Sequence, residues 1–350
     1  MPAPATSLST SGIPIPGTPR VSVIVPAFGV APYLREALAS LQRQTLQEWE
    51  AVVIDDGDPA VAKVVTPFLA DPRIRFLATA NHGVSAARNT AIAAAKAPLI
   101  ALLDGDDLFR PGYLATTVPL LEADSSLRLV TCNARKFGAV SGERLCVERP
   151  QPARSGWEGV LDRSFNVYIG STFRRVDFEA VGGFDETMTH AEDLDLWVRI
   201  MRARPEGQAC YVDAVLGEYR VRAQSASAQG QKLLRGSLKV QMKVRASLAP
   251  GDGAIPLVEQ VMNETREALA FEEAIDRIVA GQARSGLADL RRIGQHLEGA
   301  HLNSPLWQIA FALWHLAPAL AAPMLRWRRR AHSRGAARGP ASSSYIETDR

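Results

Sequence analysis

Short hydrophobic runs alternate with helix-like stretches through the first third of the chain. The run VSVIV at 21–25 is β-branched and ends at Pro26, which is typical of a strand buried on both faces of a sheet. Further strands are predicted at 51–54, 74–78 and 99–103. One helix is predicted with Pro32 in its first turn, and its apolar stripe is formed by Leu34, Ala37, Leu38 and Leu41. A second helix is predicted near 84–95. This alternation predicts an α/β fold with a Rossmann-like, mainly parallel sheet.

The pattern is looser beyond residue 127. It predicts a strand at 127–132, a helix at 191–203 and short strands at 209–215 and 218–221. Helix-like stretches interrupted by Gly and Pro follow and predict a small C-terminal helical appendage. We expect a disordered leader at 1–19 and a catalytic domain at 20–230. The appendage at 231–300, an apolar and basic helix at 301–330 and a disordered tail at 331–350 would follow.

Composition and charge narrow the class of protein. The 350 residues are 47% hydrophobic and 22% charged, as in an ordinary globular protein, and the net charge of +3 is too small to indicate nucleic-acid binding. Three widely spaced cysteines, Cys132, Cys146 and Cys210, indicate neither a disulfide framework nor a zinc site. The first nineteen residues lack the features of a secretory signal. We therefore expect a cytoplasmic protein.

A cluster of acids follows the predicted strand at 99–103. The sequence LLDGDDL places Asp104, Asp106 and Asp107 on one loop, where their mutual repulsion calls for a cation. A hard metal such as Mg²⁺ or Mn²⁺ held there would bridge a diphosphate, and Gly105 would leave room for the ligand. The alternative is a polar turn in which an aspartate caps a helix at Pro111.

Paired acids also end the predicted strand at 51–54. In VVIDDGD, Asp55 and Asp56 follow a buried run, and a carboxylate in that position can accept from a nucleobase N–H or a ribose hydroxyl. The alternative is an Asp-Gly turn.

Several motifs together resemble family 2 glycosyltransferases. They occur in the family's order and cover roughly residues 20–227: VSVIVPAF, VIDDGD, NHGVSAARNTAI, LLDGDD, GGFDE and AEDLDLW. The resemblance implies a GT-A fold, a nucleotide-sugar donor that is commonly a UDP-sugar, and inversion at the anomeric carbon. The QxxRW pattern of processive synthases is absent after Asp193, and its absence favours transfer of a single sugar.

The resemblance also implies roles for individual residues. Pro26, Ala27 and Phe28 would border the nucleobase, Asp56 would hydrogen-bond it with Asp55 beside it, and Arg88 would lie near the base or the diphosphate. Asp104 is similar to the ribose-side acid and Asp106 to the main metal ligand, with Asp104 as a further ligand and Asp107 nearby. Asp193, beside Glu192, is similar to the catalytic base.

The role of Asp193 also has a physical basis. A sugar hydroxyl is a very weak acid, so a carboxylate must take its proton as the new bond forms. The alternative for Glu192 and Asp193 is the favourable placement of acids in the first turn of a helix.

Two positions depart from the family's pattern. Phe28 and Gly29 stand where tyrosine and asparagine are frequent, which keeps a stacking surface but loses polar contacts. Arg222 stands where a late histidine is frequent, and it can meet a diphosphate but cannot ligate a metal.

The stretch at 306–330 is apolar until Arg326 and then strongly basic. Its length approaches that of a membrane span, but Gln308, His315, Pro318 and Pro323 interrupt it. Three interpretations are open: a membrane-surface helix anchored by Trp and Arg, a helix packed on the protein, and a true span.

The expected function is metal-dependent transfer of a sugar to the hydroxyl of a glycan or lipid-linked acceptor, in cell-surface polysaccharide synthesis at the inner face of the membrane. One alternative is a degenerate GT-A module that binds a nucleotide or a partner without catalysis. A nucleotidyltransferase or dehydrogenase is disfavoured, because no Gly-rich phosphate loop follows the first strand.

Overall fold

The computed structural model describes residues 6–7, 18–140, 143–204, 206–222, 230–294, 312–314, 316–317 and 319–325. They fall into two compact units, 1–137 with 143–220 and 138–142 with 221–350. The strands of the first unit are β1 Thr6–Ser7, β2 Val21–Ala27, β3 Trp49–Asp56, β4 Ile74–Thr79, β5 Leu99–Leu102, β6 Leu108–Phe109, β7 Leu127–Gly138, β8 Arg144–Leu145, β9 Arg154–Ser155, β10 Thr172–Arg174 and β11 Gln208–Val221, whose last residue passes into the second unit. The helices of the first unit are α1 Ala31–Gln42, α2 Pro59–Val65, the 3-10 helix η1 Thr66–Ala70, α3 Val84–Ala93, α4 Tyr113–Ala123, α5 Trp157–Leu161, α6 Arg175–Ala180 and α7 Glu192–Ala203.

The described strands form one sheet in the order β1-β4-β3-β2-β5-β10-β7-β11-β6. Strands β4, β3, β2 and β5 are parallel, as the alternating pattern predicts. Strand β10 pairs antiparallel with β5 and β7, and β6 pairs antiparallel with β11, so the sheet is mixed beyond β5. Thr6 and Ser7, placed in the disordered leader by the sequence analysis, pair with β4.

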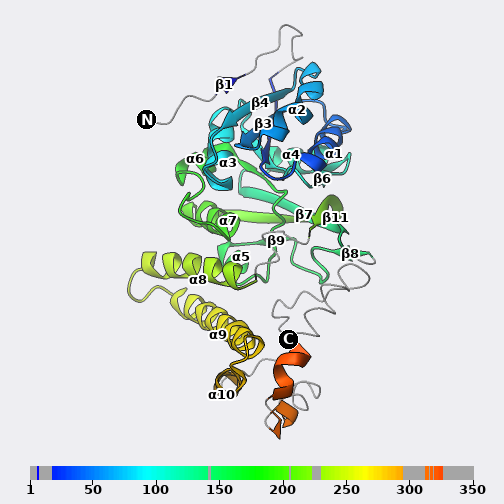
Figure 1. Cartoon of the computed structure of the whole chain (residues 1–350). Helices are drawn as coiled ribbons and strands as arrows, with labels where there is room; N and C mark the ends of the chain where they lie inside the picture. Colours follow the sequence, from blue (N-terminus) through cyan, green and yellow to red (C-terminus); the bar gives the residue numbers. More distant parts are fainter. Residues whose placement is uncertain are drawn as a thin grey trace. The chain divides into compact units, whose positions relative to one another are not determined.

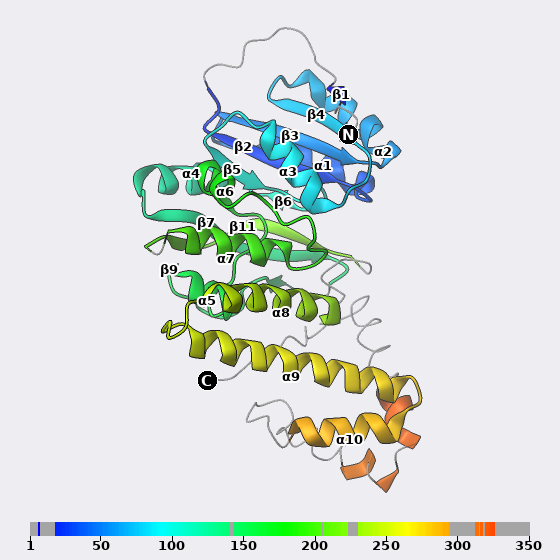
Figure 2. The same ribbon diagram turned by 90° about the vertical axis from the view of Figure 1, so that its left-hand side faces the viewer.

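Helices cover both faces of this sheet. Figures 1 and 2 show α3, α6 and α7 on one side of the sheet. On the other, the predicted stripe of α1 is fully buried and joins a core that includes α2, α4 and alternate residues of β2: Val21, Val23, Val25 and Ala27. Because both faces are covered, polar groups are accessible chiefly at the ends of the strands.

The sheet differs from the prediction at its far edge. Strands expected at 209–215 and 218–221 form the single strand β11. Gly217 lies in its middle, where an added Cβ would be 2.6 Å from the Tyr168 ring. The glycine therefore marks a close approach of Tyr168 to the strand and not a break between two strands.

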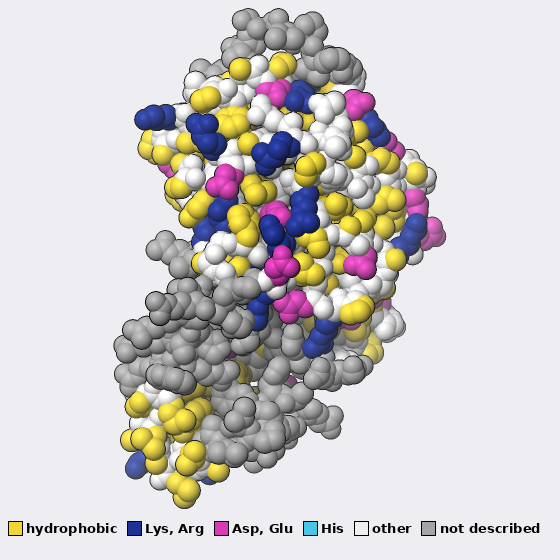
Figure 3. Space-filling view, turned by 90° about the vertical axis from the view of Figure 1, so that its right-hand side faces the viewer, with side chains coloured by type: hydrophobic (Ala, Val, Ile, Leu, Met, Phe, Trp, Pro, Cys, Tyr) yellow, Lys and Arg dark blue, Asp and Glu magenta, His cyan; other side chains and the backbone are white. Residues whose placement is uncertain are grey.

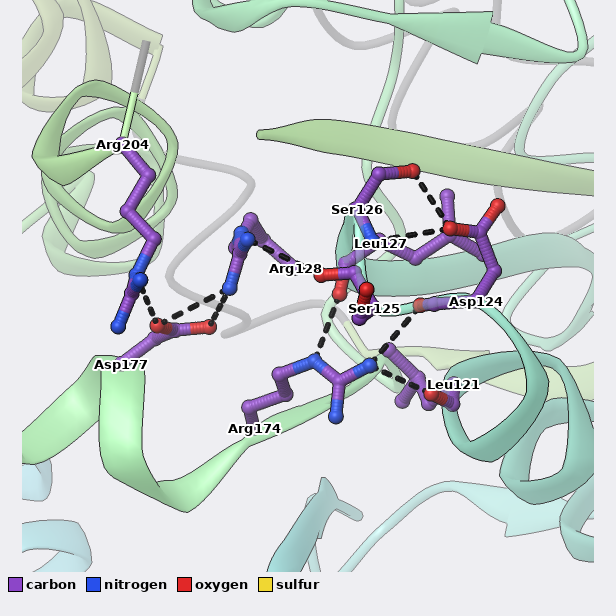
Figure 4. Close-up of polar contacts among 9 residues, drawn as sticks. All are labelled: Leu121, Asp124, Ser125, Ser126, Leu127, Arg128, Arg174, Asp177 and Arg204. Atoms are coloured by element: carbon purple, nitrogen blue, oxygen red, sulfur yellow. Dashed lines mark hydrogen bonds and ion pairs between the residues drawn. The ribbon is translucent and has the colours of Figure 1, made fainter. Parts of the chain in front are cut away.

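An ion cluster around the buried Asp177 joins α6, β7 and the end of α7. Figure 4 shows Asp177 between Arg128 and Arg204, with N···O distances of 3.3 and 3.5 Å. Beside it, Arg174 donates to the carbonyls of Leu121 and Asp124 and so satisfies the C-terminal end of α4. These contacts hold the helix that carries Asp193 in place.

The second unit contains the helices α8 Gly230–Ser247, α9 Ile255–Val279 and α10 Ala283–Gly294. Helical residues between 312 and 325 pack on α9 and α10, with Trp314, Ala321 and Leu325 buried in their core. The opposite side of this segment is exposed, Leu316 to 86% and Leu320 to 51%. Within the described residues, no helix is both long and hydrophobic enough to cross a membrane. Residues 306–311 and 326–330 of the predicted helix, and the tail at 331–350, lie outside the described residues.

Candidate functional site

The carboxyl ends of the parallel strands bring the predicted donor-site residues to one edge of the sheet. Pro26 and Ala27 end β2, and Asp55 and Asp56 end β3. Phe28 follows β2 with 56% of its surface exposed. An exposed aromatic ring at this edge offers a flat surface on which a nucleobase can stack.

Asp56 is already engaged by the backbone. Its Oδ1 accepts from His82 N at 2.9 Å and its Oδ2 from Gly83 N at 3.0 Å. Asp56, which is only 3% exposed, therefore fixes the loop before α3. Sequence reasoning did not identify the roles of His82 and Gly83, although both lie in the NHGVSAARN motif.

Asp55 and Gly57 shape the same turn. Asp55 Oδ1 accepts from Asp58 N, and burial raises the pKa of Asp55, with Asp58 and Asp56 adding to it and backbone hydrogen bonds opposing it. Gly57 has φ +88°, and an added Cβ would be 2.9 Å from Asn81 N. The Asp-Gly turn proposed as an alternative is thus present, and it lies at the edge of the candidate site.

The acid-rich loop lies against the end of β2. An added Cβ on Gly105 would be 2.9 Å from Pro26 O and 2.8 Å from Val30, so the glycine permits the loop to pack on the protein. The predicted reason, room for a ligand, is therefore not needed to explain it. Asp104 is the most accessible acid of the loop, with 29% of its side chain exposed.

The donor set of this loop fits Mg²⁺ or Mn²⁺. These ions prefer carboxylate oxygens, and at nucleotide sites they take one or two carboxylates and complete their shell with phosphates and water. Asp104 and Asp106 could supply the carboxylates. Within the described ranges, no group of three or more His, Cys, Asp or Glu side chains is arranged to hold a metal.

Asp107 is a buried structural acid. Its Oδ1 accepts from Arg220 N at 2.8 Å and its Oδ2 from the Tyr168 hydroxyl at 3.2 Å. Burial raises the pKa of Asp107 well above its usual range, and Asp104 raises it further. With both oxygens engaged and 1% exposure, Asp107 is poorly placed to ligate a metal.

Arg88 joins the acid loop to the helix that carries Asp193. Its Nη2 donates to Asp104 Oδ1 at 2.7 Å and its Nη1 to Glu192 Oε1 at 2.9 Å. The guanidinium lies 5.3 Å from the Phe184 ring centre, and Arg88 is only 2% exposed. Burial lowers the pKa of Arg88, but Asp104 and Glu192 together raise it, so the side chain stays charged.

Asn89, the next residue, holds the GGFDE segment. Its Nδ2 donates to Phe184 O and its Oδ1 accepts from Phe184 N, at 3.0 and 2.9 Å. Through Arg88 and Asn89, the AARN motif therefore contacts both AEDLDLW and GGFDE, which lie about a hundred residues further along the chain.

Asp193 lies in the first turn of α7, whose N-terminal dipole favours carboxylates. Burial raises the pKa of Asp193 to about 6, and Glu192 adds to the rise. The Leu194 N–H, Arg88 and Arg163 act in the opposite direction. A carboxyl with a pKa near neutrality is suited to take a proton and release it again.

Backbone strain gathers near Asp193. Among the described non-glycine residues, only Arg163 and Ala191 have positive φ, at 63° and 58°. Ala191 immediately precedes α7, and Arg163 follows α5. Strained backbone of this kind is frequent at functional sites. No local pattern singles out Arg163, because an arginine after a short helix is ordinary.

Helices α5 and α7 explain why Arg163 lies near Asp193. The Arg202 guanidinium, near the end of α7, is 5.2 Å from the ring centre of Trp157, the first residue of α5. Together with the electrostatic effect of Arg163 on Asp193, this contact indicates that the two helices run in opposite directions. Arg222, the remaining predicted residue, belongs to the second unit.

Comparisons with known sequences agree with the motif pattern. Residues 22–158 match the family model described as Glycosyl transferase family 2. The chain is 31% identical over 220 residues to y4gI of Sinorhizobium fredii, covering 61% of this chain and 24% of that protein. It is 44% identical over 91 residues to the glycosyltransferase EpsJ of Bacillus subtilis, covering 25% and 26%, and 24% identical over 208 residues to chondroitin synthase of Escherichia coli, covering 57% and 29%. These alignments span about a quarter of the length of the three relatives.

Solved structures share the fold. TarS 1–349 of S. aureus, in complex with UDP-GlcNAc, has a TM-score of 0.53 at 16% identity, covering 71% of this chain and 72% of that one. The mannosyltransferase PcManGT of Pyrobaculum calidifontis, in complex with GDP-Man and Mn²⁺, has a TM-score of 0.56 at 18% identity, covering 94% and 89%. The expected GT-A fold is confirmed.

Proposed function

From the premise that this chain is a family 2 glycosyltransferase of GT-A fold, we propose that it transfers one sugar, with inversion, from a nucleoside-diphosphate donor to an acceptor hydroxyl. The observation that carries the proposal is that Arg88 hydrogen-bonds both Glu192, the neighbour of Asp193 in the chain, and Asp104 in the acid loop. These contacts would link the proposed base to the loop that would face the leaving diphosphate.

In the proposed reaction, the Asp193 carboxylate accepts the proton of the acceptor hydroxyl. The acceptor oxygen forms a bond to the anomeric carbon while the bond from that carbon to the diphosphate oxygen breaks on the opposite face, which inverts the configuration. A divalent metal held by Asp104 and Asp106 would neutralise charge on the diphosphate. Arg88 keeps Asp104 and Glu192 at fixed positions during this step.

We propose a UDP-sugar as the donor, with the base stacked near Phe28 and hydrogen-bonded by Asp56 and its neighbour Asp55. Pro26 and Ala27 would form the floor of this subsite. The complexes of TarS with UDP-GlcNAc and of PcManGT with GDP-Man and Mn²⁺ support a nucleotide-sugar donor and a divalent metal, and a panel of UDP- and GDP-sugars distinguishes the bases.

For the acceptor, we propose a glycan or lipid-linked glycan in cell-surface polysaccharide synthesis. The similarity to chondroitin synthase supports a polysaccharide acceptor. The exposed face of the segment at 312–325, with Leu313, Leu316, Leu320 and Met324, supports contact with the inner membrane surface. Four arginines between 326 and 330 would add attraction to anionic lipid, whereas Trp314 is buried and does not contribute.

The experiment that tests the catalytic assignment is Asp193→Asn. We expect kcat to fall about 100-fold or more while donor affinity, measured by calorimetry, stays nearly unchanged, because the amide keeps the shape but does not accept the proton. Glu179→Gln is the control, because Glu179 is an exposed acid of α6 outside the candidate site, and this variant should turn over like the wild type. Wild-type turnover by Asp193→Asn would remove Asp193 from the mechanism and leave the catalytically inactive binding module as the better reading.

A further inference from the structure

Arg220, near the end of β11, contacts the acid loop through its backbone and its side chain. Its backbone N–H donates to Asp107 Oδ1, and its Nε donates to the carbonyl oxygen of Asp106, both at 2.8 Å. The two acids that follow Gly105 are therefore both held by one residue, which is 114 positions away from Asp106.

The guanidinium of Arg220 is itself immobilised. Its carbon lies 4.6 Å from the Tyr33 ring centre and 4.3 Å from that of Phe137, and its Nη2 donates to Glu36 at 2.9 Å. Only 11% of the side chain is exposed. Cation–π contacts on two rings and an ion pair leave the planar group little freedom to turn.

Strand pairing fixes the other end of the loop. Leu108, directly after Asp107, pairs with Glu218 in the β6–β11 register, and Arg110 N donates to Leu216 O at 2.8 Å. Strand β11 therefore sets the path of the backbone after the acids, while Arg220 sets the orientation of the Asp106 peptide. Rotation of that peptide would also move the Asp106 carboxylate.

We propose that Arg220 is a positioning residue for metal binding: it orients Asp106 toward the metal by holding the Asp106 carbonyl. The proposal rests on the metal role assigned to Asp106 above. Arg220 thus has a structural role at the acid loop. The sequence suggests a role only for Arg222, two residues further along the same strand end.

The test uses the full chain and Mn²⁺ alone, with free Mn²⁺ measured by electron paramagnetic resonance and the measurement repeated with UDP and with GDP. Arg220→Met keeps an aliphatic stem between the two rings and removes the hydrogen bonds of the guanidinium. We expect its dissociation constant for Mn²⁺ to rise about 10-fold, as for other groups that orient a metal ligand. Its kcat at saturating Mn²⁺ should recover most of the wild-type value, because the base is untouched.

Arg135→Met is the matched control. Arg135 also contacts β11, through Glu218 at 2.8 Å, and the substitution should leave Mn²⁺ binding unchanged. Arg220→Lys keeps the charge but not the planar fork and should bind Mn²⁺ with intermediate affinity. Thermal unfolding of each variant separates loss of fold from loss of metal.

The outcomes separate this proposal from the function on which it rests. Weaker Mn²⁺ binding in folded Arg220→Met, with Arg135→Met like the wild type, supports the positioning role. Equal Mn²⁺ affinity in Arg220→Met and wild type overturns it and leaves the metal assignment intact. A wild-type chain that binds no Mn²⁺, with or without nucleotide, overturns the metal assignment and this proposal together.

Discussion

The pH dependence of turnover offers a quantitative test of the Asp193 environment. With a pKa of about 6, the carboxyl is ionised in about nine-tenths of molecules at pH 7 and one-tenth at pH 5. Because kcat/KM reports the ionisation of the free enzyme, it should fall about tenfold per pH unit well below pH 6. The charged groups around Asp193 are Glu192, Arg88 and Arg163. Removing any of them should shift the acid limb of the pH profile, the fall of kcat/KM below pH 6, in a known direction.

Arg163→Gly is the sharpest perturbation. Removing the positive charge raises the pKa of Asp193, so the limb moves to higher pH. Arg163 is exposed, and exposed ion pairs contribute about 0.2–1 kcal/mol. At 1.36 kcal/mol per pH unit this corresponds to a shift of about 0.2–0.7 units, or a loss of about 1.5- to 5-fold in kcat/KM at pH 5. At pH 8 the variant should match the wild type.

Stability distinguishes this effect from damage to the fold. Arg163 has φ 63°, a conformation for which glycine is the usual residue after a helix, so the variant should keep its stability or gain about 1 kcal/mol. The assay is nucleoside-diphosphate release from pH 5 to 8 at low and high salt, with Arg163→Lys as the charge-preserving control. An unshifted limb in Arg163→Gly, or an equal loss of activity at every pH, would refute the electrostatic reasoning.

Three further predictions concern the metal, the fold and the membrane. EDTA should abolish activity and Mn²⁺ or Mg²⁺ should restore it, and full activity in metal-free buffer would contradict the metal role. Asp106→Ala should weaken metal-dependent donor binding, whereas Asp104→Ala should mainly weaken nucleotide recognition. Calorimetry with and without metal checks both variants. Asp177→Ala leaves the half-buried Arg128 without its acid and should lower the free energy of unfolding by about 2 kcal/mol in urea titrations. An unchanged midpoint would show that the cluster in Figure 4 does not contribute. Leu316→Glu should reduce flotation with anionic liposomes, whereas unchanged flotation would favour a segment that only packs on the protein.

Charged side chains of both signs lie on the surface of the described residues. On the face drawn in Figure 3, the described Lys and Arg side chains are interspersed with Asp and Glu. A basic stripe, the usual footprint of a nucleic-acid site, is not seen among the described residues of that face.

Local sequence patterns predicted the four parallel strands, the helices that follow β2 and β4, and the edge at which the acids gather. Runs such as 21–25 and 99–103 are too apolar to lie anywhere but between two layers of helices, and parallel strands must end at a common edge. The resemblance to the family motifs adds Asp104, Asp106 and Asp193 as predicted site residues, and their roles stay predictions.

The residues that hold these acids come from distant parts of the chain and are visible only in the folded protein. Arg88 meets Glu192 across 104 positions and Arg220 meets Asp106 across 114, and no local pattern specifies a contact at that separation. The same holds for Gly105 and Gly217, whose neighbours Pro26 and Tyr168 come from other parts of the sheet. Local periodicity fixes which face of an element is buried, but the partner of a buried charge depends on how distant elements pack, and this is why the sequence identified the acids and the structure identified their positions.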